Sequence, residues 1–257
     1  MDRAIVFDAA GSRDEGCFII LQRTYLAKRD LLMEIKTLTF GGVNCYLLSI
    51  HSGFLLIDTG FSKNRVDVEK GLESAGCKPG SLRLIVLTHG DFDHSGNAAY
   101  LRGKYNAKIA MHNADKGMVE KGDLFYNRNA NFLMRIMGKI LLFFMRGGLK
   151  KEDRFTPDMY VDDGDDLSHL GFDAKVIHIP GHSAGSIGVL TDAGDLFCGD
   201  LLENTKEPAK NSLIADKKAF EASVEKLKQL KIGMVYPGHG EPFQMELFMK
   251  SQAQSGK

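Results

Sequence analysis

The sequence of 257 residues has no tryptophan, little cysteine and no excess charge of either sign. Its four cysteines, Cys17, Cys45, Cys77 and Cys198, form no CxxC pair and have no zinc-knuckle spacing. Widely separated cysteines in a chain of this size favour a reducing compartment. Basic and acidic residues number 33 each, so the chain lacks the basic field on which nucleic-acid binding depends. We therefore expect a small-molecule substrate and no nucleic-acid partner.

Long apolar runs are also missing. No stretch of about 18 apolar residues occurs, so we expect no transmembrane segment. The first apolar run, 4–7, follows Arg3 and is broken by Asp8, whereas a signal peptide needs a core of roughly 7–15 apolar residues. The pattern predicts a cytoplasmic protein.

Apolar residues make up 44% of the chain, enough for a sizeable core. Strands, loops and helices are expected to alternate in both halves, which predicts an α/β fold with layered sheets in one domain, 1–257. Residues 1–33 form an N-terminal extension of uncertain structure. The expected strands are 4–7, 17–22, 34–40, 43–50, 54–58, 84–87, 108–111, 174–179, 186–191, 195–199 and 233–236, and the expected helices are 62–75, 98–104 and 217–230.

A dense group of polar residues follows the buried strand 84–87. Two histidines and two aspartates, His89, Asp91, Asp93 and His94, lie within six positions. Imidazole nitrogen and carboxylate oxygen both bind first-row divalent metals. A loop that curls after the strand could direct these side chains to one centre.

Each of three later strands is also followed by a single His or Asp next to glycine. His182 follows Pro180-Gly181, Asp200 follows Gly199, and His239 follows Pro237-Gly238. Glycine lets the backbone turn sharply and approach a metal closely. Four strand ends that carry His or Asp predict one composite metal site at the edge of a sheet.

In order and spacing, the stretch 89–94, the later His182, Gly199-Asp200 and His239, and the turn Asp58-Thr59-Gly60 resemble the metallo-β-lactamase superfamily. The resemblance covers roughly 34–243. It implies a four-layer αββα sandwich with two divalent metal ions at one edge. By position, site one would consist of His89, Asp91 and His182, site two of Asp93, His94 and His239, and Asp200 would bridge the two ions.

One position departs from the family pattern, which usually has histidine where this chain has Asp91. A carboxylate makes site one harder and more anionic than an imidazole would. Zinc is the first expectation, and Asp91 also favours iron or manganese. The flavodiiron branch of the family has a carboxylate at the same position.

Supporting residues are expected around the ligands. Asp58 is interpreted as a residue that orients a ligand histidine. Ser183 and Ser186 are expected to fix the loop of His182 by hydrogen bonds. His178 is interpreted as structural, and His112 could line the pocket.

The expected activity is metal-dependent hydrolysis by a hydroxide that the two ions generate from water, cleaving an ester, thioester, lactone or phosphodiester bond. Asp93 is the candidate catalytic residue because it could take or steer a proton. The alternatives are a di-iron oxidoreductase like the flavodiiron proteins but without a flavin domain, and a non-catalytic signalling member of the fold.

A helical insertion or lid is expected over 113–160. Its segment 131–146 has Leu133, Met137 and Phe144 on one helical face, with a wider apolar stripe around them. Packing on its own domain, a lid over an apolar substrate, and contact with a second copy or a membrane surface are all compatible with this pattern. A homodimer is therefore one expectation.

Overall fold

The computed structural model describes residues 18–26, 32–50, 53–128, 132, 133, 135–137, 140 and 148–255. Its strands are β1 (Phe18–Leu26), β2 (Leu32–Phe40), β3 (Val43–Ile50), β4 (Gly53–Ile57), β5 (Leu82–Val86), β6 (Lys108–Met111), β7 (Met159–Tyr160), β8 (Ala174–His178), β9 (Ile187–Thr191), β10 (Asp195–Gly199), β11 (Leu202–Glu203), β12 (Ala209–Lys210), β13 (Met234–Pro237) and β14 (Phe243–Gln244). Its α-helices are α1 (Arg65–Ser74), α2 (Phe92–Ser95), α3 (Ala98–Tyr105), α4 (Lys116–Lys121), α6 (Lys217–Lys228) and α7 (Met245–Ser255). Short 3-10 turns lie at Ser62–Asn64, Asn113–Asp115, Lys151–Asp153 and Ser168–Leu170.

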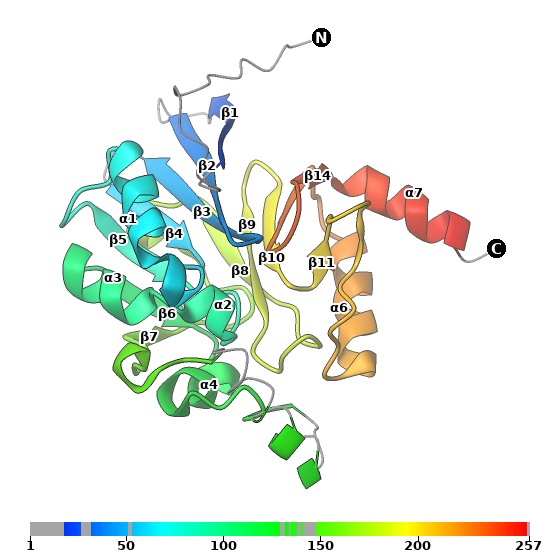
Figure 1. The fold of residues 1–257 in the computed structure, drawn as a ribbon. Helices are drawn as coiled ribbons and strands as arrows, with labels where there is room; N and C mark the ends of the chain where they lie inside the picture. Colours follow the sequence, from blue (N-terminus) through cyan, green and yellow to red (C-terminus); the bar gives the residue numbers. More distant parts are fainter. Residues whose placement is uncertain are drawn as a thin grey trace.

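Two main sheets form the centre of the molecule (Figure 1). The first has the order β1-β2-β3-β4-β5-β6-β7, antiparallel up to β4 and parallel from β4 to β7. The second has the order β14-β13-β10-β9-β8, in which only the β10–β13 pair is parallel. Parallel strands end at the same edge of a sheet, so β5 of the first sheet and β10 and β13 of the second can deliver loop residues to a shared edge.

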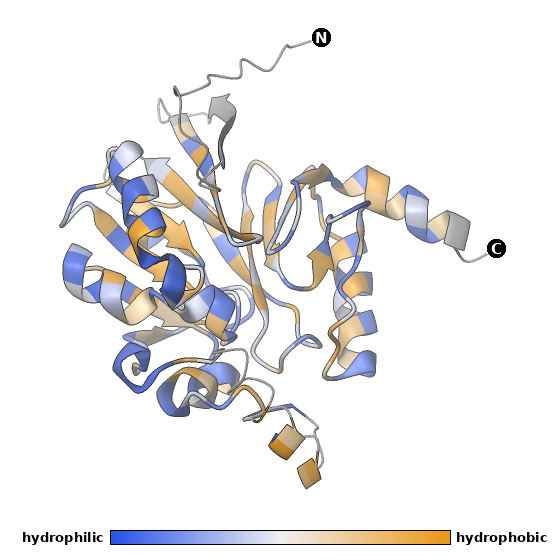
Figure 2. Ribbon diagram, viewed as in Figure 1, coloured by the Kyte–Doolittle hydropathy of each residue, from blue (hydrophilic) through white to orange (hydrophobic). Residues whose placement is uncertain are grey.

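Alternation along β5 shows how the layers form. Leu84 and Val86 face the core between the two sheets, whereas Ile85 and Leu87 face the helices on the outer side. The outer core of the first sheet includes side chains of α1 and α3, and that of the second sheet includes side chains of α6 and α7. In Figure 2 much of the apolar colour lies on the strands of the two sheets, while α1, α3, α6 and α7 mix apolar and polar residues. The result is the αββα sandwich that the resemblance implies.

Most of the strands expected from sequence are confirmed to within two residues, including the antiparallel meander β2-β3-β4. The expected helix 217–230 is α6, and its N-cap Asp216 accepts a hydrogen bond from the Ala219 amide at 3.0 Å. The short elements α4, β7 and β14 and the helix α7 were not predicted. The expected strand 4–7 lies outside the described residues, and β1 adds part of the N-terminal extension to the first sheet.

The segment 113–160 contains α4 and β7, and β7 pairs with β6. Its described apolar side chains between 132 and 140 are 39–79% exposed, namely Phe132, Leu133, Ile136, Met137 and Ile140. Figure 1 shows these short helical pieces beyond α4, away from both sheets. These five side chains are thus not part of the domain core, while Phe144 lies outside the described residues. Across the described part of the chain, no helix has the length and apolar character needed to span a bilayer.

Candidate metal centre

All seven residues singled out from sequence lie together at one edge of the sandwich. The loop and short helix after β5 carry His89, Asp91, Asp93 and His94. The loops after β8, β10 and β13 carry His182, Asp200 and His239. The first sheet therefore supplies four of the candidate ligands and the second sheet supplies three.

The first group consists of His89, Asp91 and His182. The Asp91 Oδ2 atom lies 3.0 Å from His182 Nε2 and 3.5 Å from His89 Nε2. All three residues are buried, and their potential ligand atoms lie within 4.8 Å of one another. Ligands bound about 2.0–2.2 Å from one tetrahedral ion are separated by comparable distances.

The second group consists of Asp93, His94 and His239. Asp93 Oδ2 lies 3.7 Å from the Nε2 atom of each histidine. Asp200 lies between the two groups, with Oδ1 3.3 Å from His94 Nε2 and Oδ2 3.3 Å from His239 Nε2. Its Oδ2 atom is also 3.9 Å from His182 Nε2, so this carboxylate is placed to serve both groups.

Hydrogen bonds fix the orientation of the imidazole rings. Nδ1 of His182 lies 2.8 Å from the Leu213 carbonyl oxygen, and Nδ1 of His239 lies 2.9 Å from that of Gly42. A carbonyl oxygen can only accept, so Nδ1 carries the proton in both rings. His94 Nδ1 lies 2.8 Å from the Asp58 carboxylate, which selects the same tautomer. In these three rings Nε2 is the nitrogen that faces the centre.

His89 follows the same rule through Thr88. The Thr88 hydroxyl donates to Asp58 Oδ2 at 2.8 Å, so it accepts from His89 Nδ1 at 2.9 Å. This leaves His89 Nε2 buried without a hydrogen-bond partner, and the same holds for His94 Nε2 and Asp200 Oδ1. Buried acceptors that face one another without a donor are costly unless a cation lies among them. The residues present therefore fit a divalent metal centre.

The charges of the centre perturb its titrating groups. Burial by itself lowers the pKa of His94, but the carboxylates of Asp200, Asp93 and Asp58 hold it well above its usual value. Burial by itself raises the pKa of Asp200, but the nearby histidines, His94 first, hold it far below its usual range. The Asp200 carboxylate is thus held in its ionised form and strongly attracts positive charge.

Asp58 orients a ligand histidine, as expected from sequence, because it accepts a hydrogen bond from His94 Nδ1. It is 2% exposed and has a φ of 58°, a left-handed conformation that few residues other than glycine adopt. Besides His94 and the Thr88 hydroxyl, it accepts a hydrogen bond from the Thr88 amide at 2.8 Å. A strained, buried carboxylate with three donors fixes the start of the ligand loop.

Asp115 was not predicted from sequence, and it joins the two halves of the centre. Its fully buried carboxylate accepts from the Gly90 amide at 2.9 Å and from the Gly185 amide at 2.7 Å. It also accepts from the Ser183 hydroxyl at 2.6 Å and from the Asn127 side-chain amide. One side chain therefore ties the loop of the first sheet to the loop of the second. The expected role of Ser183 and Ser186 is confirmed, since their hydroxyls lie 2.8 Å apart within this loop.

Arg128 was also missed. Its guanidinium Nη2 donates to Asp91 Oδ2 at 2.6 Å and lies 3.2 Å from His182 Nε2, which is itself 3.0 Å from Asp91 Oδ2. Burial by itself raises the pKa of Asp91, but the guanidinium and the two histidines hold it well below its usual value. Arg128 lies between two helical stretches in a polar part of the segment 113–160, where the sequence has no motif that singles it out.

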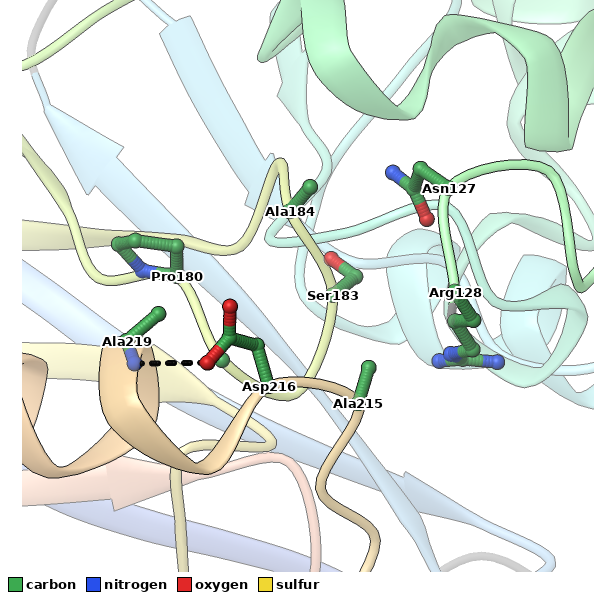
Figure 3. A pocket seen from close by; sticks show the side chains of 9 residues that line it. Asn127, Arg128, Pro180, Ser183, Ala184, Ala215, Asp216 and Ala219 are labelled. Atoms are coloured by element: carbon green, nitrogen blue, oxygen red, sulfur yellow. Dashed lines mark hydrogen bonds between the residues drawn. The ribbon is translucent and has the colours of Figure 1, made fainter. Parts of the chain in front are cut away.

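A pocket of about 420 Å³ lies beside the centre. Figure 3 shows Asn127 and Arg128 on one side of it and the beginning of α6, with Ala215, Asp216 and Ala219, across from them. The loop of His182 forms the wall between. Most of the remaining lining residues are small, namely Pro180, Gly181, Ser183 and Ala184. The pocket can accept a small group of a molecule that reacts at the metal centre.

His112 and His178, considered as pocket and structural residues, lie in a separate cluster with Asp162. Their rings are stacked, with centroids 4.2 Å apart and planes 10° from parallel. Lone pairs lie in the ring plane, so those of two stacked rings cannot converge on one ion without a rotation. This cluster is better described as a stacked pair whose His178 Nε2 donates to the Ala184 carbonyl at 3.0 Å.

Comparison with known proteins agrees with this geometry. Residues 38–239 match the family model described as the metallo-beta-lactamase superfamily. The chain belongs to this superfamily. Because the match spans most of the chain and ends at His239, it includes all seven candidate ligands.

Relatives within the superfamily include named hydrolases. The chain is 29% identical over 124 residues to hydroxyacylglutathione hydrolase GloC of Haemophilus influenzae, covering 48% of this chain and 50% of that protein. It is 29% identical over 185 residues to acyl-coenzyme A thioesterase MBLAC2 of Bos taurus, covering 68% and 61%. The chain thus spans between half and two thirds of the length of these relatives.

One solved superfamily structure is described as a di-iron-bound form of TTHA1623. It superposes with a TM-score of 0.64 at 26% identity, covering 83% of this chain and 96% of that chain. The likeness extends over the sandwich that carries the ligand loops.

Proposed function

We propose that this chain is a dinuclear metallohydrolase that cleaves a small thioester. The observation that carries the proposal is the set of inward-facing acceptors at the sandwich edge, several of which are buried without a donor. Site one would use His89, Asp91 and His182, as the resemblance implies. Site two would use Asp93, His94 and His239, and Asp200 would bridge.

The choice of metal follows from the donor set. Four imidazoles suit zinc, whereas three carboxylates make the centre harder than a histidine-only set would be. The di-iron form of TTHA1623 supports iron as the alternative to zinc for this chain. Elemental analysis of protein purified without added metal distinguishes zinc, iron and manganese, and oxygen consumption by an iron-loaded sample tests the oxidoreductase alternative.

When bound, two divalent ions lower the pKa of a water molecule and polarise the substrate carbonyl. The remaining work is done by the chain. Asp93 is 19% exposed, compared with 7% for Asp91 and 8% for Asp200, so it is the carboxylate most open to substrate. We assign to Asp93 the steering of the proton released by the attacking water. The Nδ1 hydrogen bonds of the histidines hold their rings in place during turnover.

A thioester is favoured among the bonds compatible with the fold. Acylglutathione and acyl-coenzyme A are both thioesters, and relatives named for them align with this chain at 29% identity. The neighbouring pocket, lined mainly by small side chains, suits a short acyl group. Fold alone does not choose a substrate, so this part of the proposal depends on the relatives and on the pocket.

The test is hydrolysis of matched panels of thioesters, oxygen esters, lactones and phosphodiesters by metal-loaded protein. We expect the highest kcat/KM on thioesters. Asp200→Asn should lose both bound metal and activity, while Asp192→Asn, the same change at an exposed position, should retain both. Full activity in Asp200→Asn would refute the proposed centre, whereas activity on another bond class would refute only the thioester assignment. Cytoplasmic location and a homodimer stay predictions.

A further inference from the structure

We propose that Arg128 competes with the site-one ion for Asp91 and His182, so that site one binds metal more weakly than site two. The inference depends on the dinuclear centre proposed above and concerns how that centre is filled. The Arg128 guanidinium would then determine how readily a metal ion occupies site one.

Arg128 makes several polar contacts although it lies outside the ligand loops. Its side chain is 10% exposed, Nη1 donates to the Leu124 carbonyl at 3.3 Å, and the buried Nε has no hydrogen-bond partner. Nη2 contacts Asp91 Oδ2, the carboxylate oxygen that lies 3.0 Å from His182 Nε2 and 3.5 Å from His89 Nε2, and it lies 3.2 Å from His182 Nε2 itself. The guanidinium is therefore held in place against two of the three site-one ligands.

The competition follows from the number of lone pairs. The Nδ1 proton of His182 is donated to the Leu213 carbonyl, so Nε2 of the neutral ring has a single lone pair. That lone pair can accept a hydrogen bond from Arg128 or bind an ion, but not both. Asp91 Oδ2 has two lone pairs, but a guanidinium and a divalent ion next to the same oxygen repel each other.

Site two is built differently. Among the described residues, the ion-pair partners of Asp93 and Asp200 are histidines that would themselves bind an ion, so these pairs do not oppose metal binding. Arg128 has donors only and cannot serve as a ligand. The departure from the family pattern at Asp91 also fits this picture, because a histidine at that position would offer the guanidinium no negative charge. Asp91 and Arg128 are thus expected to act as a pair.

The experiment compares metal-free wild-type protein with Arg128→Met, which keeps a long side chain but removes the charge. Zinc binding is measured by competition with a chromophoric chelator, and stoichiometry by elemental analysis. We expect wild-type protein to bind one zinc ion tightly and a second at least about tenfold more weakly. The Arg128→Met variant should bind the second ion about tenfold or more tightly than wild type, with the first unchanged, because a charge-assisted hydrogen bond no longer opposes it.

Arg102→Met is the matched control, since the Arg102 guanidinium bonds to the Thr156 carbonyl and lies outside the centre. It should leave both affinities unchanged. Unchanged affinity for the first ion in Arg128→Met also serves as its test of folding. If Arg128→Met binds the second ion no more tightly than wild type, or more weakly, Arg128 supports Asp91 rather than competing with the ion, and the inference is overturned.

A double-mutant cycle with Asp91→His tests the pairing. Asp91→His should itself tighten the second site, and adding Arg128→Met should then change the affinity far less than it does in wild type. Equal effects of Arg128→Met in both backgrounds would overturn the pairing. If neither wild-type nor variant protein binds zinc, iron or manganese, the proposed function fails together with this inference.

Discussion

Asp115→Asn offers a direct test of how the two halves of the centre are joined. The carboxylate has four donors around it, two at each oxygen: Gly185 and Asn127 at Oδ1, and Gly90 and Ser183 at Oδ2. An asparagine can present its carbonyl oxygen to only one of these pairs. Its amide nitrogen, itself a donor, then faces the other pair.

The loss of stability in Asp115→Asn follows from this arrangement of donors. With the carbonyl oxygen at the Oδ1 position, the Ser183 hydroxyl can rotate and accept from the new amide, but the Gly90 amide cannot. A buried donor left without a partner costs about 1–3 kcal/mol, and the two hydrogen bonds that remain lose their charge assistance. We expect the free energy of unfolding of the metal-free protein to fall by about 2–4 kcal/mol, which is about 1 M in the urea midpoint at an m-value of about 3 kcal/mol/M.

The assay is urea unfolding of metal-free protein followed by circular dichroism, with Asp192→Asn as the control. Metal-free protein is used because bound ions would add their own stabilisation. Metal affinity is measured on the same variant and should fall more at site one, whose Asp91 and His182 lie on the two loops that Asp115 joins. Wild-type stability in Asp115→Asn, or an equal loss at both sites, would refute the reasoning.

Three further outcomes are expected. Asp58→Ala should weaken zinc binding about 10–100-fold, because His94 loses the acceptor that orients its ring; affinity within twofold of wild type would count against this role. Metal affinity should decrease as pH falls, because protons compete for the same Nε2 atoms, and the raised pKa of His94 should extend that competition to higher pH than for a free imidazole; chelator competition at several pH values checks the sign. Replacing both Leu133 and Met137 by alanine should raise KM for long acyl substrates more than for short ones if the segment acts as a lid, and an equal change for both classes would rule the lid out.

The ligands were predictable because their signal is local. His89, Asp91, Asp93 and His94 lie within six positions after a buried strand, and His182, Asp200 and His239 each follow a strand end beside glycine. Short apolar runs predicted those strands, and the parallel pairs then brought their ends to one edge. The support from Asp58 was predictable for the same reason, since it ends a strand of the same sheet.

Asp115 and Arg128 could not be predicted, because their roles depend on contacts between segments far apart in sequence. Asp115 is 25 residues from Gly90 and 70 from Gly185. Nothing in the local pattern shows that the turn before α4 and the segment after α4 place these two residues beside the loops. The apolar stripe of the same segment has a clear periodicity in sequence, but its described side chains are exposed. The short elements β7 and β14 were missed because two residues carry no periodicity.

The division of the ligands between the two sheets has a mechanical consequence. Four side chains extend from the first sheet and three from the second, and each group of three ligands with its bridging Asp200 includes members of both. Each bound ion would therefore link the two sheets of the sandwich at the edge where their polar side chains meet. The spacing between the sheets is set further inside by Tyr46, Phe197 and Tyr236, whose ring centroids lie 4.7–5.4 Å apart. Tyr46 also donates a hydrogen bond to the Pro237 carbonyl at 2.6 Å, two residues before His239. The aromatic packing between the sheets thus sets the distance between the two halves of the centre. A change in ring size at these positions should therefore change the affinity of the centre for metal.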